Sequence, residues 1–150
     1  MTPFVTAGAG FLLAVLWFDL MFDSQVLRHP GRDLPEDVLA SISAYYRRVT
    51  TAARPMNRLV ALAMLATLVA IVIELARDDV PNWVGRVSLA LAISAILLAA
   101  VHTFPSARQL GARSDTLAHQ SRLARSICRD HLFCLAAIVS LLTIQLVFAR

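Results

Sequence analysis

Four long apolar stretches constrain this chain more than any other feature of its sequence. They cover residues 4–22, 56–75, 84–101 and 132–148, and no proline interrupts any of them. Each is close to the roughly 20 residues that an α-helix needs to cross the hydrocarbon core of a bilayer. Backbone groups in lipid must find hydrogen bonds within their own helix. The sequence therefore predicts an all-α fold, a bundle of four transmembrane helices in a single integral membrane domain, residues 1–150.

The composition agrees with a membrane protein. Hydrophobic residues make up 58% of the 150 residues, above the roughly 45–50% that is usual for soluble domains. A core of this size could not bury the excess. We therefore expect lipid to cover much of the surface.

The basic residues are all arginine, and their distribution predicts the orientation of the chain. Arg77, Arg86 and Arg150 lie on one side of the predicted membrane. The other arginines lie in or beside the two long loops: Arg28, Arg32, Arg47, Arg48, Arg54, Arg58, Arg108, Arg113, Arg122, Arg125 and Arg129. By the positive-inside rule both long loops are cytoplasmic and both termini lie outside, in a bacterial inner membrane. Arginines placed in this way indicate membrane lipids as partners and not nucleic acid.

The first long loop contains apolar residues at helical spacing, with polar residues on the opposite side. The apolar positions are Val38, Leu39, Ile42, Tyr45, Tyr46 and Val49; the polar ones are Ser41, Ser43, Arg47 and Arg48. This pattern predicts an amphipathic helix. Two placements remain open, one at the membrane interface and one as a cytoplasmic extension of the second span, kinked near Pro55. A second amphipathic helix, beginning at Ser114 and Asp115, is expected to continue into the fourth span.

Small residues four apart indicate where the helices pack together. Gly10 and Ala14 form such a pair in the first span, and Ala66 and Ala70 form one in the second. Pairs of this kind allow two membrane helices to approach closely. We expect these faces to form the helix contacts.

Two further local expectations follow from spacing. Glu74 and Arg77 are three residues apart in one helix, which favours an ion pair between them. Pro105 is expected to end the third helix just after His102, because proline cannot continue the backbone hydrogen bonding of a helix.

Polar residues gather at one end of the predicted bundle and are the candidate ligand-binding residues. They are Asp19, Asp23, Arg58, His102 and His131. Four membrane crossings would bring them to the cytoplasmic side. Ionisable residues at membrane depth usually pair with one another or mark a functional site.

Three interpretations of this cluster remain open. In the first, Asp19 or Asp23 pairs with Arg58 or Arg129, and the cluster only staples helices together. In the second, the aspartates and histidines form an acid/base or metal site, since oxygen and imidazole ligands suit iron, manganese or zinc. In the third, the cluster binds a lipophilic ligand, and a histidine or aspartate moves a proton. No metalloprotease motif, phosphate loop or CxxC motif identifies a catalytic residue, a metal or a cofactor. Cys128 and Cys134 are expected to be buried thiols.

The layout also resembles the anthrone oxygenase-like family of small four-helix membrane proteins. Three segments carry the resemblance: AARPMN at 52–57, HTFPSARQL at 102–110 and SRLARSICRDH at 121–131. Some fungal members of that family are linked to the oxygenation of anthrones. The resemblance implies a pocket for a flat hydrophobic substrate, and it assigns no catalytic residue.

Three functions follow as hypotheses. The leading one is a membrane protein that binds or oxidises a lipophilic aromatic small molecule at the polar cluster. The second is a structural or accessory subunit that docks a partner membrane protein. The third is a small homo-oligomeric transporter that uses the few polar residues within the spans: Thr67, Ser88, Ser94, Ser140 and Thr143.

Overall fold

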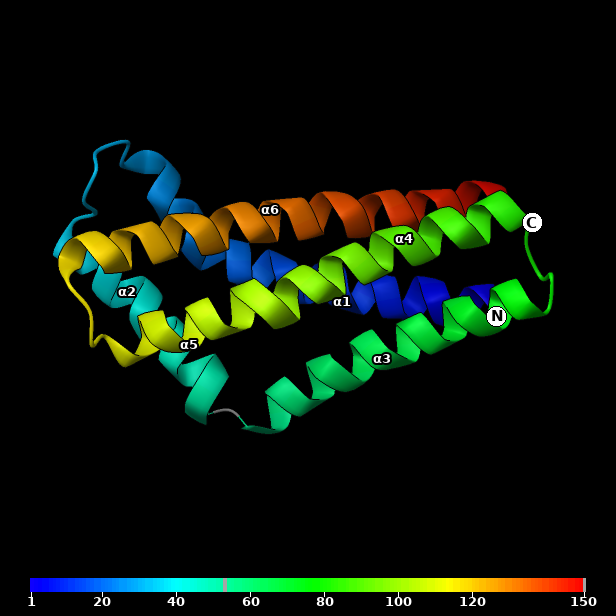
Figure 1. Ribbon diagram of the computed structural model, residues 1–150, viewed down its shortest axis with the longest axis horizontal. Helices are drawn as coiled ribbons and strands as arrows, with labels where there is room; N and C mark the ends of the chain where they lie inside the picture. Colours follow the sequence, from blue (N-terminus) through cyan, green and yellow to red (C-terminus); the bar gives the residue numbers. More distant parts are fainter. Residues whose placement is uncertain (53, 150) are drawn as a thin grey trace.

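The computed structural model describes residues 1–52 and 54–149, and it is built of helices connected by short turns (Figure 1). The described part of the chain contains no strand, which confirms the all-α prediction. The helices are α1 (Thr2–Asp23), α2 (Glu36–Arg47), α3 (Arg54–Ala76), α4 (Asn82–Leu98), α5 (Phe104–Ala112) and α6 (Leu117–Phe148). A 3₁₀ turn follows α1, and π turns follow α2 and α4: Ser24–Arg28, Arg48–Ala52 and Ala99–Thr103.

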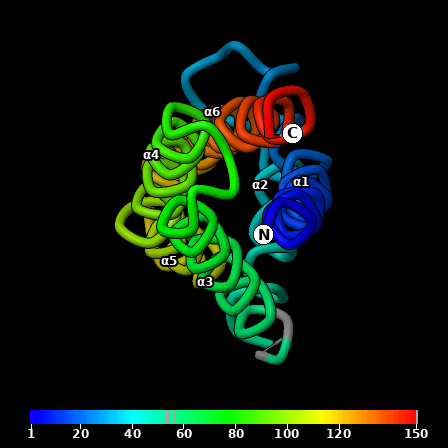
Figure 2. The backbone as a smooth tube through the Cα atoms, turned by 90° about the vertical axis from the view of Figure 1, so that its right-hand side faces the viewer, coloured from blue at the N-terminus to red at the C-terminus, as the bar shows by residue number. Residues whose placement is uncertain are grey.

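Among the described residues, four helical segments are long and apolar enough to cross a membrane, and we call them the spanning helices: Thr2–Arg28, Asn57–Ala76, Asn82–Ala112 and Leu117–Phe148. Their packing forms a ring in which α1 contacts α3, α3 contacts α4, α4 contacts α6, and α6 contacts α1 (Figure 2). Both chain termini lie at the same end of this bundle (Figure 1). We call that end the Glu74 end, and the opposite one, where α1 finishes, the Asp23 end.

The centre of the bundle is filled by small and branched apolar side chains from all four spanning helices. The buried members of this core are Val5, Ala9, Leu12, Ala70, Ile71, Ala92, Ala95, Cys134, Ala137, Ile138 and Leu141. The outward faces are also apolar, with Phe4 and Trp17 on α1, Leu62 on α3, Leu97 on α4 and Leu146 on α6 exposed. A bundle that is apolar on both its inner and outer sides suits a lipid solvent.

The contact between α1 and α3 does not use the small-residue pair that the sequence predicts. Gly10 has open space around it and Ala14 is exposed, so this face points away from the other helices. Gly8 makes the close contact instead, because a Cβ built there would lie 2.0 Å from Thr67 Oγ1. The prediction for Gly10 and Ala14 was wrong because the motif marks a face that permits close approach, and the long-range core decides which face is used.

A second core lies at the Asp23 end, where α2 packs against α5 and the first half of α6. Its buried residues are Val26, Leu34, Val38, Leu39, Ile42, Tyr46, Ala107, Leu110, Ala124, Ile127 and Cys128. We call this layer of α2, α5 and residues 117–129 the helical cap. The amphipathic pattern of α2 is confirmed, and other helices of the protein cover its apolar face. Ser43 departs from the pattern, since it is buried although it was expected on the polar side.

The loop before α2 is fastened to α6. The Arg125 guanidinium donates hydrogen bonds to the backbone carbonyls of His29 (2.8 Å) and Gly31, and the Leu34 N–H donates to Ser121 Oγ at 2.9 Å. At the other side of the cap, Gly111 lies so close to the backbone of Arg47 that a Cβ there would be 2.8 Å from its nitrogen. The cap is therefore a packed layer and not a set of loose loops.

The third span does not end at Pro105. The chain passes from α4 through the π turn Ala99–Thr103 into α5, and the helix stops only at Ala112. Proline lacks a backbone N–H, and its ring crowds the preceding turn. The wider π turn accommodates both effects. Within it, Thr103 Oγ1 donates a hydrogen bond to the backbone carbonyl of Leu98 at 3.3 Å. The fourth span behaves as predicted, since α6 is one helix of 32 residues from the cap to the Glu74 end.

The expected ion pair between Glu74 and Arg77 is absent from the described residues. Glu74 is fully buried and Arg77 is exposed, so the two side chains leave the helix on different sides. Helical spacing of three residues permits a contact, but the carboxyl group has hydrogen-bond donors inside the bundle: Thr2 and Gln145.

The close contact at Gly8 predicts a position-specific effect of adding a methyl group. We expect Gly8→Ala to lower the unfolding free energy by about 1–3 kcal/mol, because the methyl must push Thr67 away. Gly10→Ala is the matched control and should leave stability unchanged or raise it, since its Cβ meets open space. Thermal unfolding in detergent, followed by circular dichroism, measures both. Equal losses for the two variants would contradict the predicted contact.

Candidate functional site

Two aspartates of α1, two tyrosines of α2 and a histidine of α6 form one polar cluster at the Asp23 end, with hydrogen bonds in two groups. Tyr46 donates its hydroxyl to Asp23 Oδ1 at 2.6 Å, and His131 Nδ1 lies 2.6 Å from Asp23 Oδ2. Tyr45 donates to Asp19 Oδ1, also at 2.6 Å. Because a carboxylate only accepts hydrogen bonds, Nδ1 of His131 carries the proton in its bond to Asp23. The cluster joins the cap to two spanning helices.

The cluster is closed to solvent at its centre. Asp23 is 0% exposed and His131 is 8% exposed. The His131 ring stands between the two carboxylates, with Nε2 at 3.8 Å from Asp19 Oδ2. Each ring nitrogen therefore faces a carboxylate oxygen, and a protonated ring would have an acceptor for both N–H groups. Asp19 and Asp23 are four residues apart in α1, and both carboxylates turn toward His131.

His102 belongs to a separate pair. Its Nδ1 lies 2.6 Å from Asp130 Oδ2, and Thr103 Oγ1 donates to the same oxygen at 3.1 Å. The imidazole is 48% exposed while the carboxylate is 7% exposed. Asp130 directly precedes His131 in α6. Asp130 binds the π turn after α4, whereas His131 binds α1. The structure thus divides the predicted cluster into a buried part and a half-exposed part.

Arg58 does not join either group. It is exposed near the start of α3, where this helix diverges from the other spanning helices (Figures 1 and 2). Arg129 is exposed as well, and neither arginine has an ion pair within the described residues. The predicted partners of Asp19 and Asp23 were therefore wrong, since neutral tyrosine hydroxyls and an imidazole bind these carboxylates instead.

Sequence reasoning missed three hydrogen-bond partners of these aspartates and histidines: Tyr45, Tyr46 and Thr103. The two tyrosines were assigned to the apolar face of α2, which correctly describes their rings but not their hydroxyl groups. A buried tyrosine hydroxyl usually finds a polar partner. Two adjacent tyrosines on a loop helix, close to two unpaired aspartates, were the available signal.

The environment raises the pKa of both tyrosines. Burial is the larger cause for Tyr45 and Tyr46, and the neighbouring carboxylates of Asp19 and Asp23 add to it by disfavouring a second negative charge. Both phenols therefore stay protonated over the physiological range and act as hydrogen-bond donors. Their rings also pack, since Tyr45 stacks on Phe22 with 4.2 Å between ring centroids.

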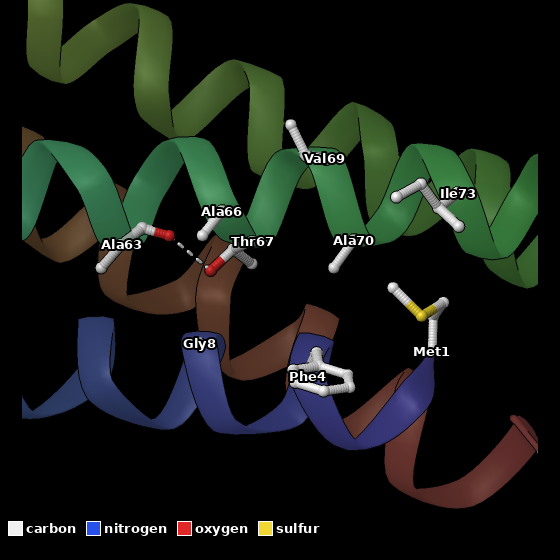
Figure 3. A pocket seen from close by; sticks show the side chains of 9 residues that line it. All are labelled: Met1, Phe4, Gly8, Ala63, Ala66, Thr67, Val69, Ala70 and Ile73. Carbon is white, nitrogen blue, oxygen red and sulfur yellow. Dashed lines mark hydrogen bonds between the residues drawn. The ribbon is translucent and has the colours of Figure 1, made fainter.

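Two grooves lie elsewhere on the molecule. The first has a volume of about 380 Å³ and lies between α1 and α3 (Figure 3). It is lined by Met1, Phe4, Gly8, Ala63, Ala66, Thr67, Val69, Ala70 and Ile73. The second, of about 400 Å³, lies beside the cap and is lined by Val26, Leu27, Pro30, Arg125, Cys128, Arg129 and Leu132. None of the five candidate residues lines either groove.

The described residues contain no group of three or more histidine, cysteine, aspartate or glutamate side chains arranged to hold a metal ion. His102 and His131, the two imidazoles of the metal hypothesis, pair with different aspartates. Cys128 and Cys134 are free and buried, as the sequence predicts. The cluster is thus organised for hydrogen bonding between helices.

Comparison with known proteins identifies no relative. No family model, no curated protein and no solved structure matches this chain.

The raised pKa values predict how the protein responds to alkali. Tyr45 and Tyr46 are the only two tyrosines in the chain. In the unfolded chain they titrate near the ordinary value of 10.0, whereas the folded protein keeps both protons above that pH. The unfolded state then binds fewer protons, so stability falls as pH rises above about 10. Ultraviolet absorbance of tyrosinate should appear only as helical circular dichroism is lost.

Denatured protein is the control and should show the absorbance change near pH 10. Tyr45→Phe and Tyr46→Phe should each remove about half of its amplitude. Ionisation of both tyrosines near pH 10 with the helices intact would contradict the buried hydrogen bonds.

Proposed function

We propose that the chain is an accessory protein of a bacterial inner membrane, which crosses the bilayer four times and holds the helical cap at the cytoplasmic face. The four apolar segments support the membrane location. The eleven arginines of the long loops lie at the Asp23 end, so the positive-inside rule favours a cytoplasmic cap and external termini.

The observation that carries this proposal is the closed cluster around Asp23. Both oxygens of this carboxylate accept hydrogen bonds from the protein, one from the cap and one from α6. A site built for a ligand normally keeps polar groups free to meet it. Here the polar groups are used to bind helices to one another, which supports the structural hypothesis over ligand binding at this place.

The exposed face of the cap provides the surface for partners. Arg47 and Arg48 lie at the exposed end of α2, Arg108 is exposed on α5, and Arg122 and Arg129 are exposed on α6. Anionic lipid head groups attract arginines placed next to a membrane. We therefore assign the lipids of the cytoplasmic leaflet as one partner, and a membrane protein docked on the cap as the other.

If the hydrogen bonds at Asp23 hold the cap to the bundle, removing one of them lowers the stability of the protein. We expect Tyr46→Phe to lower the unfolding free energy by about 1.5–3 kcal/mol, because it removes a hydrogen bond to a buried charged group. Protease cleavage in the cap should become faster. Arg58→Ala is the matched control and should change neither property, since Arg58 is exposed without a partner among the described residues. Unchanged stability and cleavage in Tyr46→Phe would contradict this role of the Asp23 hydrogen bonds.

The groove between α1 and α3 favours a second candidate function, the binding of a lipophilic small molecule. Its volume of about 380 Å³ falls within the ~300–1,000 Å³ of ligand pockets. Phe4, Ala66 and Ala70 supply apolar walls, and the Thr67 hydroxyl already donates to the Ala63 carbonyl (Figure 3). A flat aromatic molecule, as the anthrone oxygenase-like resemblance implies, is the class of ligand we propose for it.

Blocking the groove with a large side chain distinguishes ligand binding in the groove from ligand binding among the polar residues. A fluorescent anthracene derivative titrated into the purified protein should lose at least tenfold in affinity with Ala66→Phe, which places a ring in the groove. Ala90→Phe, at an exposed position of α4, is the control and should bind normally. An affinity that falls with His102→Ala and not with Ala66→Phe would instead locate the ligand at the half-exposed His102–Asp130 pair.

A further inference from the structure

A second polar group lies inside the bundle near the Glu74 end, and each spanning helix contributes one residue to it. Glu74 of α3 accepts a hydrogen bond from Thr2 Oγ1 of α1 at 2.7 Å through Oε1. Its Oε2 accepts from Gln145 Nε2 of α6 at 2.9 Å. The same amide nitrogen donates to Ser88 Oγ of α4 at 3.1 Å. This arrangement is independent of the cluster around Asp23.

The group is buried among apolar residues. Glu74 and Ser88 are 0% exposed and Gln145 is 1% exposed. Ile71 and Leu141, one helical turn away on α3 and α6, belong to the apolar core of the bundle. An ionised carboxylate in such surroundings is costly unless a positive charge accompanies it.

The charged groups at this end do not supply that positive charge within the described residues. The N-terminal ammonium of Met1 on α1 binds Asp79 in the α3–α4 turn, with 3.1 Å between the nitrogen and Oδ2. Arg77, which directly follows α3, and Arg86 of α4 are exposed, as is Asp78 in the turn. Glu74 also lies in the last turn of α3, where the helix dipole disfavours a negative charge.

One polar atom of the group has no partner. Gln145 Oε1 is buried and accepts no hydrogen bond, although the amide nitrogen beside it makes two. Exchanging the two amide atoms would leave the nitrogen without an acceptor, so the amide keeps its present orientation. A protonated Glu74 has the Thr2 hydroxyl at 2.7 Å from Oε1 instead, and this hydroxyl can turn its hydrogen away and accept the acid O–H.

We propose that Glu74 is a proton-binding site within the bundle. A proton from water at the Glu74 end adds to Oε1 of the carboxylate, and the resulting acid donates its O–H to Thr2 Oγ1. Gln145 continues to donate to Oε2, and Ser88 accepts from the same amide nitrogen. The contacts of 2.7–2.9 Å at both carboxylate oxygens suit a proton and not a metal cation, which would have to separate them.

A hydrophobic carbodiimide tests this proposal with the full chain in phosphatidylcholine vesicles. Dicyclohexylcarbodiimide takes the acid proton on one nitrogen, the carboxylate adds to its central carbon, and rearrangement leaves an N-acylurea with no leaving group. We expect peptide mass spectrometry to find one adduct on Glu74 and labelling that declines as pH rises. Glu74→Gln should lose the adduct, and Asp79→Asn should keep it.

Infrared spectroscopy provides a second measurement that does not depend on access of the reagent. The C=O band of a protonated carboxylic acid should be present in the protein and absent from Glu74→Gln. Absence of this band from the unsubstituted protein would overturn the proposal. Protection of Glu74 from labelling by sodium, compared with N-methylglucamine at the same pH and ionic strength, would overturn it in favour of a cation site.

Discussion

The contact between Asp23, His131 and Tyr46 joins three parts of the chain that are far apart in sequence. Asp23 ends the first spanning helix, His131 lies in the last one, and Tyr46 belongs to the cap. Because Asp23 is completely buried, each of its hydrogen bonds replaces one that water would otherwise make. Loss of either donor would leave a buried carboxylate with too few partners, which is one of the most destabilising situations in a protein interior. The position of α2 on the bundle depends on this arrangement.

The molecule thus combines two kinds of packing. The bundle of four long helices uses small residues, such as Gly8 against Thr67, that allow close contact between helices. The cap has a core of larger side chains, such as Leu39, Ile42 and Leu110, which resembles the interior of a soluble domain. Polar groups lie where these two parts meet and again near the opposite end.

The sequence predicted the helices well because the information is local. Length and hydropathy of each stretch were enough to find the spanning helices, and the period of α2 was enough to find its buried face. The identity of polar partners depends on three-dimensional contacts that spacing does not encode. Asp23 was matched with arginines on charge alone, and Glu74 was matched with Arg77 on distance along the helix. Both carboxyl groups turned instead toward hydroxyl, amide or imidazole donors on other helices.

The π turn Ala99–Thr103 restricts the insertion and deletion of residues between α4 and α5. A π turn holds one residue more than an α-helical turn, and one residue rotates a helix by about 100°. The inward face of α4, with Ala92 and Ala95, and the inward face of α5, with Ala107 and Leu110, are aligned through this extra residue. Ala100 and Val101 in the turn are exposed, so exchanging their side chains disturbs no packing, whereas removal of any single residue would turn α5 away from α2. The length of this segment is therefore more constrained than its composition.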